Sequence, residues 1–311
     1  MASPAQTIAS PALQAWFERR TYRAADFADT GGLVAAKREL GISVSVVLPC
    51  REVGQTIGPI AEQVMLLQES GLVDQAIAVD AASEDGTAQL ALAHGLEVHQ
   101  EEELLPRFGP VLGKGDALWR SLAVARGDVI VFADSDTANF GGHFVAGLVG
   151  PLLADPAIQF VKGSFYRDAG RVTELTARPL LAAFYPELAA FGQPLAGEVA
   201  ARRDILRAIP FCTGYAVESA MLIDVLAAAG LDAMAQVDLG TRANPHQPLP
   251  ALGRMSYEVV QALAARLERE GRGSLGQPGA DYVHAACLPE GIELVRDRVE
   301  VVERPPMQSV T

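Results

Sequence analysis

The chain has 311 residues, of which 50% are hydrophobic and 20% charged, and its formal net charge is −13. This composition is typical of a globular enzyme, and the length allows one large α/β domain with or without a smaller C-terminal extension. The acidic balance argues against broad binding to nucleic acid or to an anionic membrane, because both require a basic surface. A small phosphorylated substrate in a local basic pocket remains compatible with it.

The cysteines and the hydropathy pattern predict a cytoplasmic protein. Cys50, Cys212 and Cys287 are far apart and show no C-x-x-C spacing, which predicts neither a zinc site nor a disulfide framework. No apolar run reaches the roughly 18 residues of a transmembrane helix. The segment Met1 to Pro11 lacks the basic and apolar regions of a signal peptide.

Strand and helix patterns alternate through the first half of the chain. This βαβαβαβ order predicts a doubly wound, mostly parallel (mixed) sheet of an α/β protein with helices on both faces, followed by a mixed second half. The predicted strands of the first half are 43–48, 76–79, 96–98 and 129–133, and its helices are 56–70, 85–94 and 115–125. In the second half we expect strands at 158–162 and 233–239 and helices at 173–184, 203–208, 217–229 and 255–269.

The same patterns divide the chain into four parts. We expect an N-terminal helical arm at 1–40, a Rossmann-like half at 41–155, a mixed half at 156–270 and a C-terminal tail at 271–311. A glycine-rich segment, 270–279, is the best candidate for a linker, and the residues after it are expected to be peripheral.

The most informative motif is Asp134-Ser135-Asp136, which follows the apolar strand 129–133. Residues i and i+2 of an extended chain point to the same side, so the two carboxylates project together at the strand's end. Ligands of open α/β sheets bind at such ends, and paired oxygens suit a hard divalent cation that also binds phosphates. A solvated loop is the alternative for a lone motif of this kind.

Polar loops also follow the first two strands. Pro49, Cys50, Arg51 and Glu52 follow the first strand, and a loop from Asp80 to Thr87 follows the second. Asp80 can accept hydrogen bonds from a base or ribose, whereas Ser83 can equally be a helix cap. Gly113-Lys114-Gly115 begins a helix, where glycines admit a phosphate and the helix start favours an anion. It is not a P-loop and by itself is a weak signal.

Further candidates lie in the second half. Gly170-Arg171-Val172-Thr173 opens a helix and predicts a second anion site, with an ordinary cap as the alternative. Glu218 begins another helix, where the dipole alone would favour it. His246 follows a strand and is either a metal ligand or a solvated loop residue.

Taken together, these residues resemble the mannosyl- and glucosyl-3-phosphoglycerate synthases, and the resemblance covers nearly the whole chain. The matching motifs include Asp134-Ser135-Asp136, Gly113-Lys114-Gly115 with Ala117 to Leu122, Gly170 to Leu175, Gln193-Pro194-Leu195 with Gly197-Glu198, Gly214-Tyr215 with Val217-Glu218, Leu239-Gly240 with Arg242-Ala243, and Arg304 to Met307. The resemblance implies a retaining, metal-dependent glycosyltransferase of the GT-A fold that forms a homodimer. It implies transfer of a hexose from a nucleotide diphosphate sugar to D-3-phosphoglycerate, on the way to a compatible solute such as mannosylglycerate or glucosylglycerate.

The resemblance also implies that the half at 41–155 binds the nucleotide sugar and that the half at 156–270 binds the acceptor, and it implies roles for individual residues. Asp136, Glu218 and Lys114 are the expected catalytic residues, and the acceptor is expected at Gly170, Arg171, Val172 and Thr173. Asp136, His246 and Asp134 would hold Mg²⁺, or Mn²⁺ or Co²⁺. The family's metal-binding histidine aligns with Asn244, and we favour His246 because imidazole is the better ligand. The expected nucleotide-sugar-binding residues are Pro49, Cys50, Arg51, Glu52, Asp80, Ser83, Lys114, Asp134, Ser135, Leu195, Tyr215, Glu218 and Arg242.

One departure from the family bears on the donor. After the first strand this chain has Arg51-Glu52-Val53-Gly54, whereas the mycobacterial glucosyl enzymes have a Leu-Asn-Glu-Glu type of loop. We therefore expect GDP-mannose, and also consider GDP-glucose, with glucosyl transfer from UDP- or GDP-glucose as the alternative. Two more distant alternatives are a sugar-phosphate nucleotidyltransferase, whose usual glycine-rich loop after the first strand is missing, and a non-catalytic sugar-nucleotide-binding protein.

Overall fold

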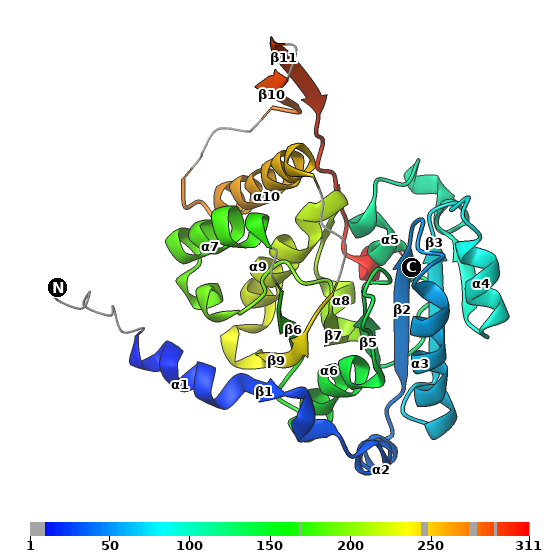
Figure 1. Ribbon diagram of the computed structural model, residues 1–311. Coiled ribbons are helices and arrows are strands. Elements are labelled where there is room, and N and C mark those ends of the chain that lie inside the picture. Colours follow the sequence, from blue (N-terminus) through cyan, green and yellow to red (C-terminus); the bar gives the residue numbers. More distant parts are fainter. Residues whose placement is uncertain (1–9, 168–169, 244–247, 274–278, 289–290, 311) are drawn as a thin grey trace, which may run out of the picture.

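An eight-stranded sheet runs through the centre of the protein (Figure 1). The computed structural model describes residues 10–167, 170–243, 248–273, 279–288 and 291–310, with the backbone alone for 284–288 and 291–293. The strand order is β1-β9-β6-β7-β5-β2-β3-β4, and β7 alone runs antiparallel to its neighbours β5 and β6. The strands are β1 (Thr21–Arg23), β2 (Val44–Cys50), β3 (Gln75–Asp80), β4 (Glu97–Gln100), β5 (Val129–Phe132), β6 (Phe160–Tyr166), β7 (Val199–Arg202) and β9 (Met234–Thr241). The predicted mostly parallel α/β sheet is confirmed.

Helices cover both faces of this sheet, and each face has its own apolar core. One core is completed by α2 (Thr30–Leu40), α3 (Ile57–Ser70), α4 (Thr87–Ala93) and α6 (Gly142–Ala154). The other is completed by α1 (Pro11–Arg20), α5 (Lys114–Ser121), α7 (Arg178–Phe184), α8 (Arg203–Ala208), α9 (Val217–Ala229) and α10 (Leu249–Arg269). Burial on both faces explains why the central strands are apolar runs rather than alternating patterns.

Local signals set most of the element boundaries. The α2 helix begins after Asp29, whose Oδ1 accepts the Gly32 N–H at 3.0 Å, as a capping carboxylate does. The α3 helix ends at Gly71, which adopts a left-handed φ of 86° that other residues disfavour. The predicted end of this helix is therefore confirmed.

Two elements carry no clear sequence signal. The α6 helix is buried from Phe144 to Leu153 and contains no charged residue, so it lacks the helical alternation of apolar and polar positions. The strand β7 has the short, alanine-rich sequence VAAR, which has little intrinsic preference for a strand. The sheet pairs it with both neighbours nevertheless, because tertiary context overrides propensity.

The C-terminal segment is not simply a peripheral tail. The hairpin of β10 (Asp281–Leu288) and β11 (Gly291–Arg298) projects from the body (Figure 1). Beyond it, β12 (Glu303–Arg304) pairs with β8 (Phe211–Cys212), and Met307 is completely buried. The expectation of a peripheral segment after 279 is therefore wrong for its final residues, because they pack into the second core.

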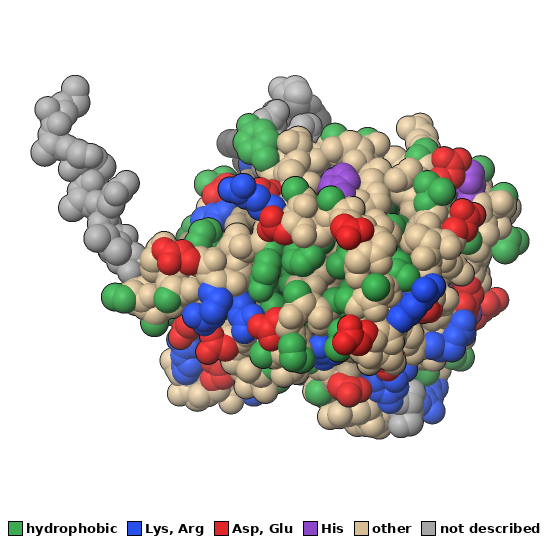
Figure 2. Space-filling view, turned by 90° about the horizontal axis from the view of Figure 1, so that it is seen from below, with side chains coloured by type: hydrophobic (Ala, Val, Ile, Leu, Met, Phe, Trp, Pro, Cys, Tyr) green, Lys and Arg blue, Asp and Glu red, His purple; other side chains and the backbone are tan. Residues whose placement is uncertain are grey.

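The face of the molecule shown in Figure 2 agrees with the acidic composition of the chain. On the face in Figure 2, acidic and basic side chains are interspersed with apolar ones, and no continuous basic patch is visible among the residues described. Among the described helices, none combines the length and apolar character that crossing a membrane would need.

Candidate active site

Sheet topology brings the predicted site residues to one edge. The strands β5, β2 and β3 are parallel neighbours, so their carboxyl ends lie at the same edge of the sheet. Asp134 follows β5, Arg51 follows β2, and Asp80 is the last residue of β3. The antiparallel β7 begins where β5 ends, since Val199 lies opposite Phe132. This places Glu198, the residue before β7, beside the end of β5 and close to Asp134.

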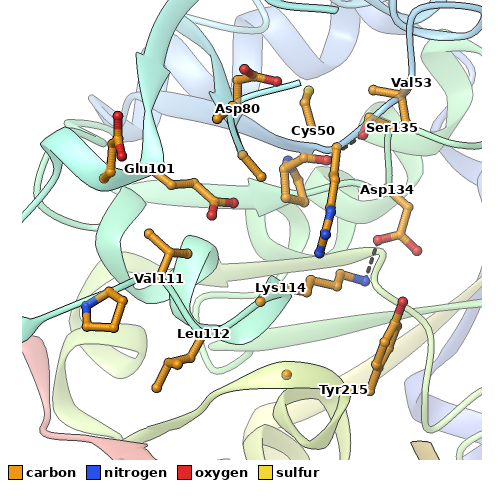
Figure 3. Close-up of a pocket in the computed structure, with 18 of the residues that line it drawn as sticks. Cys50, Val53, Asp80, Glu101, Val111, Leu112, Lys114, Asp134, Ser135 and Tyr215 are labelled. Atoms are coloured by element: carbon orange, nitrogen blue, oxygen red, sulfur yellow. Dashed lines mark hydrogen bonds and ion pairs between the residues drawn. The ribbon is translucent and has the colours of Figure 1, made fainter. Parts of the chain in front are cut away.

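A pocket of about 760 Å³ opens at this edge. Nine of the predicted residues line it: Pro49, Cys50, Arg51, Asp80, Lys114, Asp134, Ser135, Asp136 and Tyr215. Figure 3 shows Asp80 and Glu101 toward one end of the pocket and Lys114, Asp134 and Tyr215 toward the other. The pocket therefore has an acidic end and an end where cations and carboxylates alternate.

Lys114 joins two of the predicted carboxylates. Its Nζ lies 2.5 Å from Asp134 Oδ1 and 2.8 Å from Glu218 Oε1. Burial opposes the charge on Lys114, but Asp134 and Glu218 outweigh burial and raise its pKa above the usual range. Lys114 is thus a permanently charged cation at the edge of the pocket.

Arg242 holds three carboxylates at the end of β9. One guanidinium nitrogen, Nη2, lies 2.9 Å from Asp134 Oδ2 and 2.8 Å from Asp136 Oδ1. The other, Nη1, lies 3.1 Å from Oε1 of the fully buried Glu198. Neither Arg242 nor Glu218 lines the pocket directly, and both act on it through the side chains they contact.

Burial and neighbouring charges shift the pKa values of two acids in this cluster, Asp134 and Glu198, in opposite directions. Burial alone would raise the pKa of Asp134, but Lys114 and Arg242 lower it well below the usual range. For Glu198, burial outweighs the attraction of Arg242 and raises the pKa to about 7. Lys162 donates to the Ala196 carbonyl at 2.6 Å, and burial lowers its pKa to about 8. Lys114 and Arg242 therefore keep Asp134 ionised, whereas burial favours the neutral form of Glu198.

The residues present fit a divalent metal ion. Asp134 and Asp136 both contact the same nitrogen of Arg242, so their oxygens converge on one cationic point. Oxygen donors converging in this way suit Mg²⁺ or Mn²⁺. The described residues hold no group of three or more metal-binding side chains, and the third predicted ligand, His246, lies outside the described residues, as does Asn244.

Besides Arg242 and Glu218, three further predicted nucleotide-binding residues do not line the pocket: Glu52, Ser83 and Leu195. The Ser83 hydroxyl donates to Asp80 Oδ1 at 2.6 Å and accepts the Glu52 N–H at 2.9 Å. Ser83 and Glu52 therefore hold the Asp80 loop in place, and Ser83 is not a helix cap. Leu195 packs against a small apolar cluster that includes Val172.

The predicted acceptor turn begins a helix, but it is separate from the nucleotide pocket. Gly170 has a φ of 115°, and its carbonyl accepts the Glu174 N–H at 2.9 Å. Val172 and Thr173 are buried, whereas Arg171 is exposed. Among these four residues, Arg171 is thus the one whose side chain faces solvent most fully.

Sequence reasoning missed several residues that connect these parts. The Arg167 guanidinium donates to Thr173 Oγ1 at 3.0 Å and lies over the Phe165 ring, with 5.7 Å from its Cζ to the ring centroid. Arg242 lies against the same ring, at 5.1 Å. Phe165 thereby links the acceptor turn to the carboxylate cluster. Neither Phe165 nor Arg167 could be found from local sequence, because their roles depend on the end of β6 lying beside β9.

Glu101 and the C-terminal segment were also missed. Glu101 lines the acidic end of the pocket, and Arg298 at the end of β11, with Val299 and Glu300 just after it, contributes to the pocket lining. The segment 101–103 contains three consecutive glutamates, which in sequence indicate only a solvated turn.

Comparison with known proteins places the site in a family context. Residues 45–215 match the family described as glycosyl transferase family 2. Glucosyl-3-phosphoglycerate synthase from Mycolicibacterium paratuberculosis is 44% identical over 295 residues, which cover 89% of this chain and 87% of that protein. The enzyme of the same name from Petrotoga mobilis is 38% identical over 307 residues, with 94% of each chain covered.

Solved structures agree with this result. Mannosyl-3-phosphoglycerate synthase from Rubrobacter xylanophilus superposes with a TM-score of 0.92 at 50% identity. That match covers 96% of this chain and 99% of the other. Glucosyl-3-phosphoglycerate synthase from Mycobacterium tuberculosis, in complex with Mn²⁺, UDP and glucosyl-3-phosphoglycerate, superposes with a TM-score of 0.81 at 44% identity. That match covers 91% of this chain and 96% of the other.

Proposed function

The chain belongs to the glucosyl- and mannosyl-3-phosphoglycerate synthases within glycosyl transferase family 2, and we propose that it transfers mannose from GDP-mannose to D-3-phosphoglycerate. It is a metal-dependent glycosyltransferase that acts as a glycosyl-3-phosphoglycerate synthase. The observation that carries the site assignment is the convergence of Asp134 and Asp136 on one cationic point, beside Lys114 and at one end of a nucleotide-sized pocket.

The donor diphosphate would lie at this end of the pocket. Asp136, with Asp134 beside it and His246 as the further ligand, would hold the metal ion, which supplies positive charge to the leaving phosphate. Lys114 and Arg242 add two fixed cations, and their pKa values are raised by the carboxylates around them, so both stay charged throughout the reaction. Preorganised charge of this kind stabilises negative charge as it develops on the leaving group.

Retention of the anomeric configuration does not require an enzyme nucleophile here. Glu218 is paired with Lys114 and Glu198 with Arg242, so both are candidates for orienting the sugar. With a nucleotide diphosphate as leaving group, its phosphate oxygen can take the proton of the acceptor hydroxyl on the same face of the sugar. The acceptor phosphate would bind at Gly170 to Thr173, where the helix start and Arg171 favour an anion.

The choice of mannose and guanosine is the finer part of the proposal. It is supported by the loop from Cys50 to Gly54, which departs from the glucosyl pattern, and by the 50% identity to a mannosyl enzyme. Glucosyl transfer from UDP- or GDP-glucose is the second candidate, because the relatives from Mycolicibacterium and Petrotoga are named glucosyl-3-phosphoglycerate synthases.

A side-by-side assay tests the proposal. GDP-mannose, GDP-glucose and UDP-glucose are each incubated with D-3-phosphoglycerate and Mg²⁺, and nucleotide release and the phosphorylated product are measured. We expect the highest kcat/KM with GDP-mannose and no turnover after chelation. Preferred turnover of UDP-glucose would instead favour the glucosyl candidate. Metal-dependent nucleotide release that requires the acceptor also separates this enzyme from a nucleotidyltransferase or a binding protein. The homodimer and the cytoplasmic location stay predictions.

A further inference from the structure

Glu101 is a buried carboxylate that the proposed chemistry does not use. It follows β4 directly, is only 6% exposed and lines the pocket at the end away from Asp134. No hydrogen bond to its side chain is found within the part of the chain that the structure describes. A buried carboxylate without a donor is costly, so its exposure to the pocket points to a ligand.

The surroundings of Glu101 favour a flat base that carries donors. Asp80, another acid at this end, already accepts from the Ser83 hydroxyl and from Gln100 Nε2 at 3.0 Å. The apolar side chains of Val111 and Leu112 lie on the Glu101 side of the pocket in Figure 3. An aromatic base can therefore lie against apolar side chains with its edge toward Glu101.

We propose that Glu101 reads the guanine base of the donor by accepting hydrogen bonds from its N1–H and its 2-amino group. An ionised carboxylate is an acceptor-only group with two oxygens, and guanine presents two adjacent donors that match them. The pairing edge of uracil has one donor between two carbonyl oxygens, and that of adenine has an acceptor beside its amino group. Both of these edges place lone pairs against the carboxylate. This inference rests on the proposed use of a guanosine donor and names the residue that selects it.

The charge state of Glu101 provides an independent readout. Burial raises its pKa to about 7, Asp116 and Asp80 add to this increase, and Arg120 and Arg51 oppose it. These four groups lie on α5, at the end of β3 and in the loop after β2, and Glu102, Arg298 and Glu300 also line the pocket. Since two acceptor oxygens require the ionised form, affinity for GDP should increase relative to UDP as the pH rises from 6 to 8. The ratio removes effects on the diphosphate and metal that both nucleotides share.

The test compares nucleotide affinities by calorimetry with Mn²⁺ present. Wild-type protein is titrated with GDP, with inosine diphosphate, which lacks the 2-amino group, and with UDP. Glu101→Gln is titrated in the same way. Glu103→Gln is the control, because it removes one charge from the same turn at an exposed position outside the pocket.

We expect the wild type to bind GDP about tenfold or more tightly than inosine diphosphate, as the loss of one hydrogen bond to a charged group predicts. Glu101→Gln should lose most of the preference for GDP over UDP, together with the pH dependence of that preference, while its affinity for UDP stays at the wild-type value. Glu103→Gln should bind both nucleotides with wild-type affinity. If the wild type binds GDP and Glu101→Gln keeps the same preference, the inference is overturned and the donor proposal stands. If the wild type binds UDP and not GDP, the donor proposal fails and Glu101 is not a guanine reader.

Discussion

Gly197 lies directly against the Asp134 carboxylate, and any side chain at position 197 would overlap Asp134 Oδ1 and Lys114 Nζ. The turn before β7 therefore passes through the centre of the ion-pair network. This close approach requires the smallest residue, because neither the backbone nor the partly buried charges of Asp134 and Lys114 can move away without losing a contact.

The first prediction follows from this contact. Gly197→Ala should lower kcat/KM by roughly tenfold or more, about 1.4 kcal/mol of transition-state stabilisation, because it displaces Asp134 and Lys114 without removing either. Steady-state kinetics would measure the change. Gly31→Ala is the matched control, since an exposed helix position there accepts a methyl group without a close contact. Unaltered kinetics for Gly197→Ala would contradict the placement of this turn.

The second prediction concerns the metal ion. Asp136→Asn replaces a charged oxygen ligand by a neutral one and should weaken Mn²⁺ binding by at least roughly tenfold, with a larger loss of turnover. Calorimetric titration with Mn²⁺ in the presence of the nucleotide measures the affinity directly. Glu69→Gln, an exposed acid on α3, should behave as the wild type. Full activity of Asp136→Asn in chelator-treated buffer would rule out its role as a ligand.

The third prediction concerns the acceptor. Arg171→Ala should raise the KM for 3-phosphoglycerate by about ten- to hundredfold, the cost of one charge-assisted hydrogen bond, and change the KM for the sugar nucleotide far less. Gly170→Val should be worse, because a β-branched residue disfavours the φ of 115° at this position. Glycerate, which lacks the phosphate, is the control substrate: it should be a poor acceptor that is insensitive to Arg171→Ala. An unchanged acceptor KM would mean that the phosphate binds elsewhere.

The fourth prediction concerns stability and pH. Glu101 has a folded-state pKa of about 7, above the roughly 4.3 of an unfolded glutamate, so the folded protein keeps this proton longer as the pH rises. The stability that this raised pKa contributes is fully present at low pH and is lost as the pH rises from roughly 4.3 to about 7. Glu101→Gln should therefore unfold like the wild type near pH 4.5 and be more stable by roughly 1–3 kcal/mol at pH 8. Urea denaturation at both pH values measures this, and an equal difference at both would contradict the raised pKa.

The fifth prediction concerns the C-terminal segment. Two guanidinium nitrogens of Arg304 each lie 2.8 Å from an oxygen of the fully buried Asp116, so Arg304→Ala leaves a buried carboxylate without its main partner. The free energy of unfolding should fall by about 3–5 kcal/mol. Arg296→Ala removes an exposed ion pair to Asp281 on the hairpin and should cost about 0–1 kcal/mol. Equal effects of the two substitutions would show that this segment is peripheral after all.

The sequence alone determined the parts of this protein that local patterns encode. Apolar runs such as 129–133 are typical of strands buried on both faces, and Gly71 marks a helix end through its left-handed conformation. The Asp134-Ser135-Asp136 motif was placed correctly at a strand end, because chain direction and side-chain alternation decide where such carboxylates point.

The tertiary structure decided which charges meet. The antiparallel direction of β7 brings Glu198 and Gly197 to the end of β5, and the neighbouring strands β6 and β9 bring Arg167 and Arg242 to the same ring of Phe165. Glu101 became a pocket residue, and Arg304 became buried, only through contacts with distant segments. The physical reason is that the energy of a charge depends on its burial and its partners. Strand order and long-range packing set both, and a local pattern of residues carries no record of either.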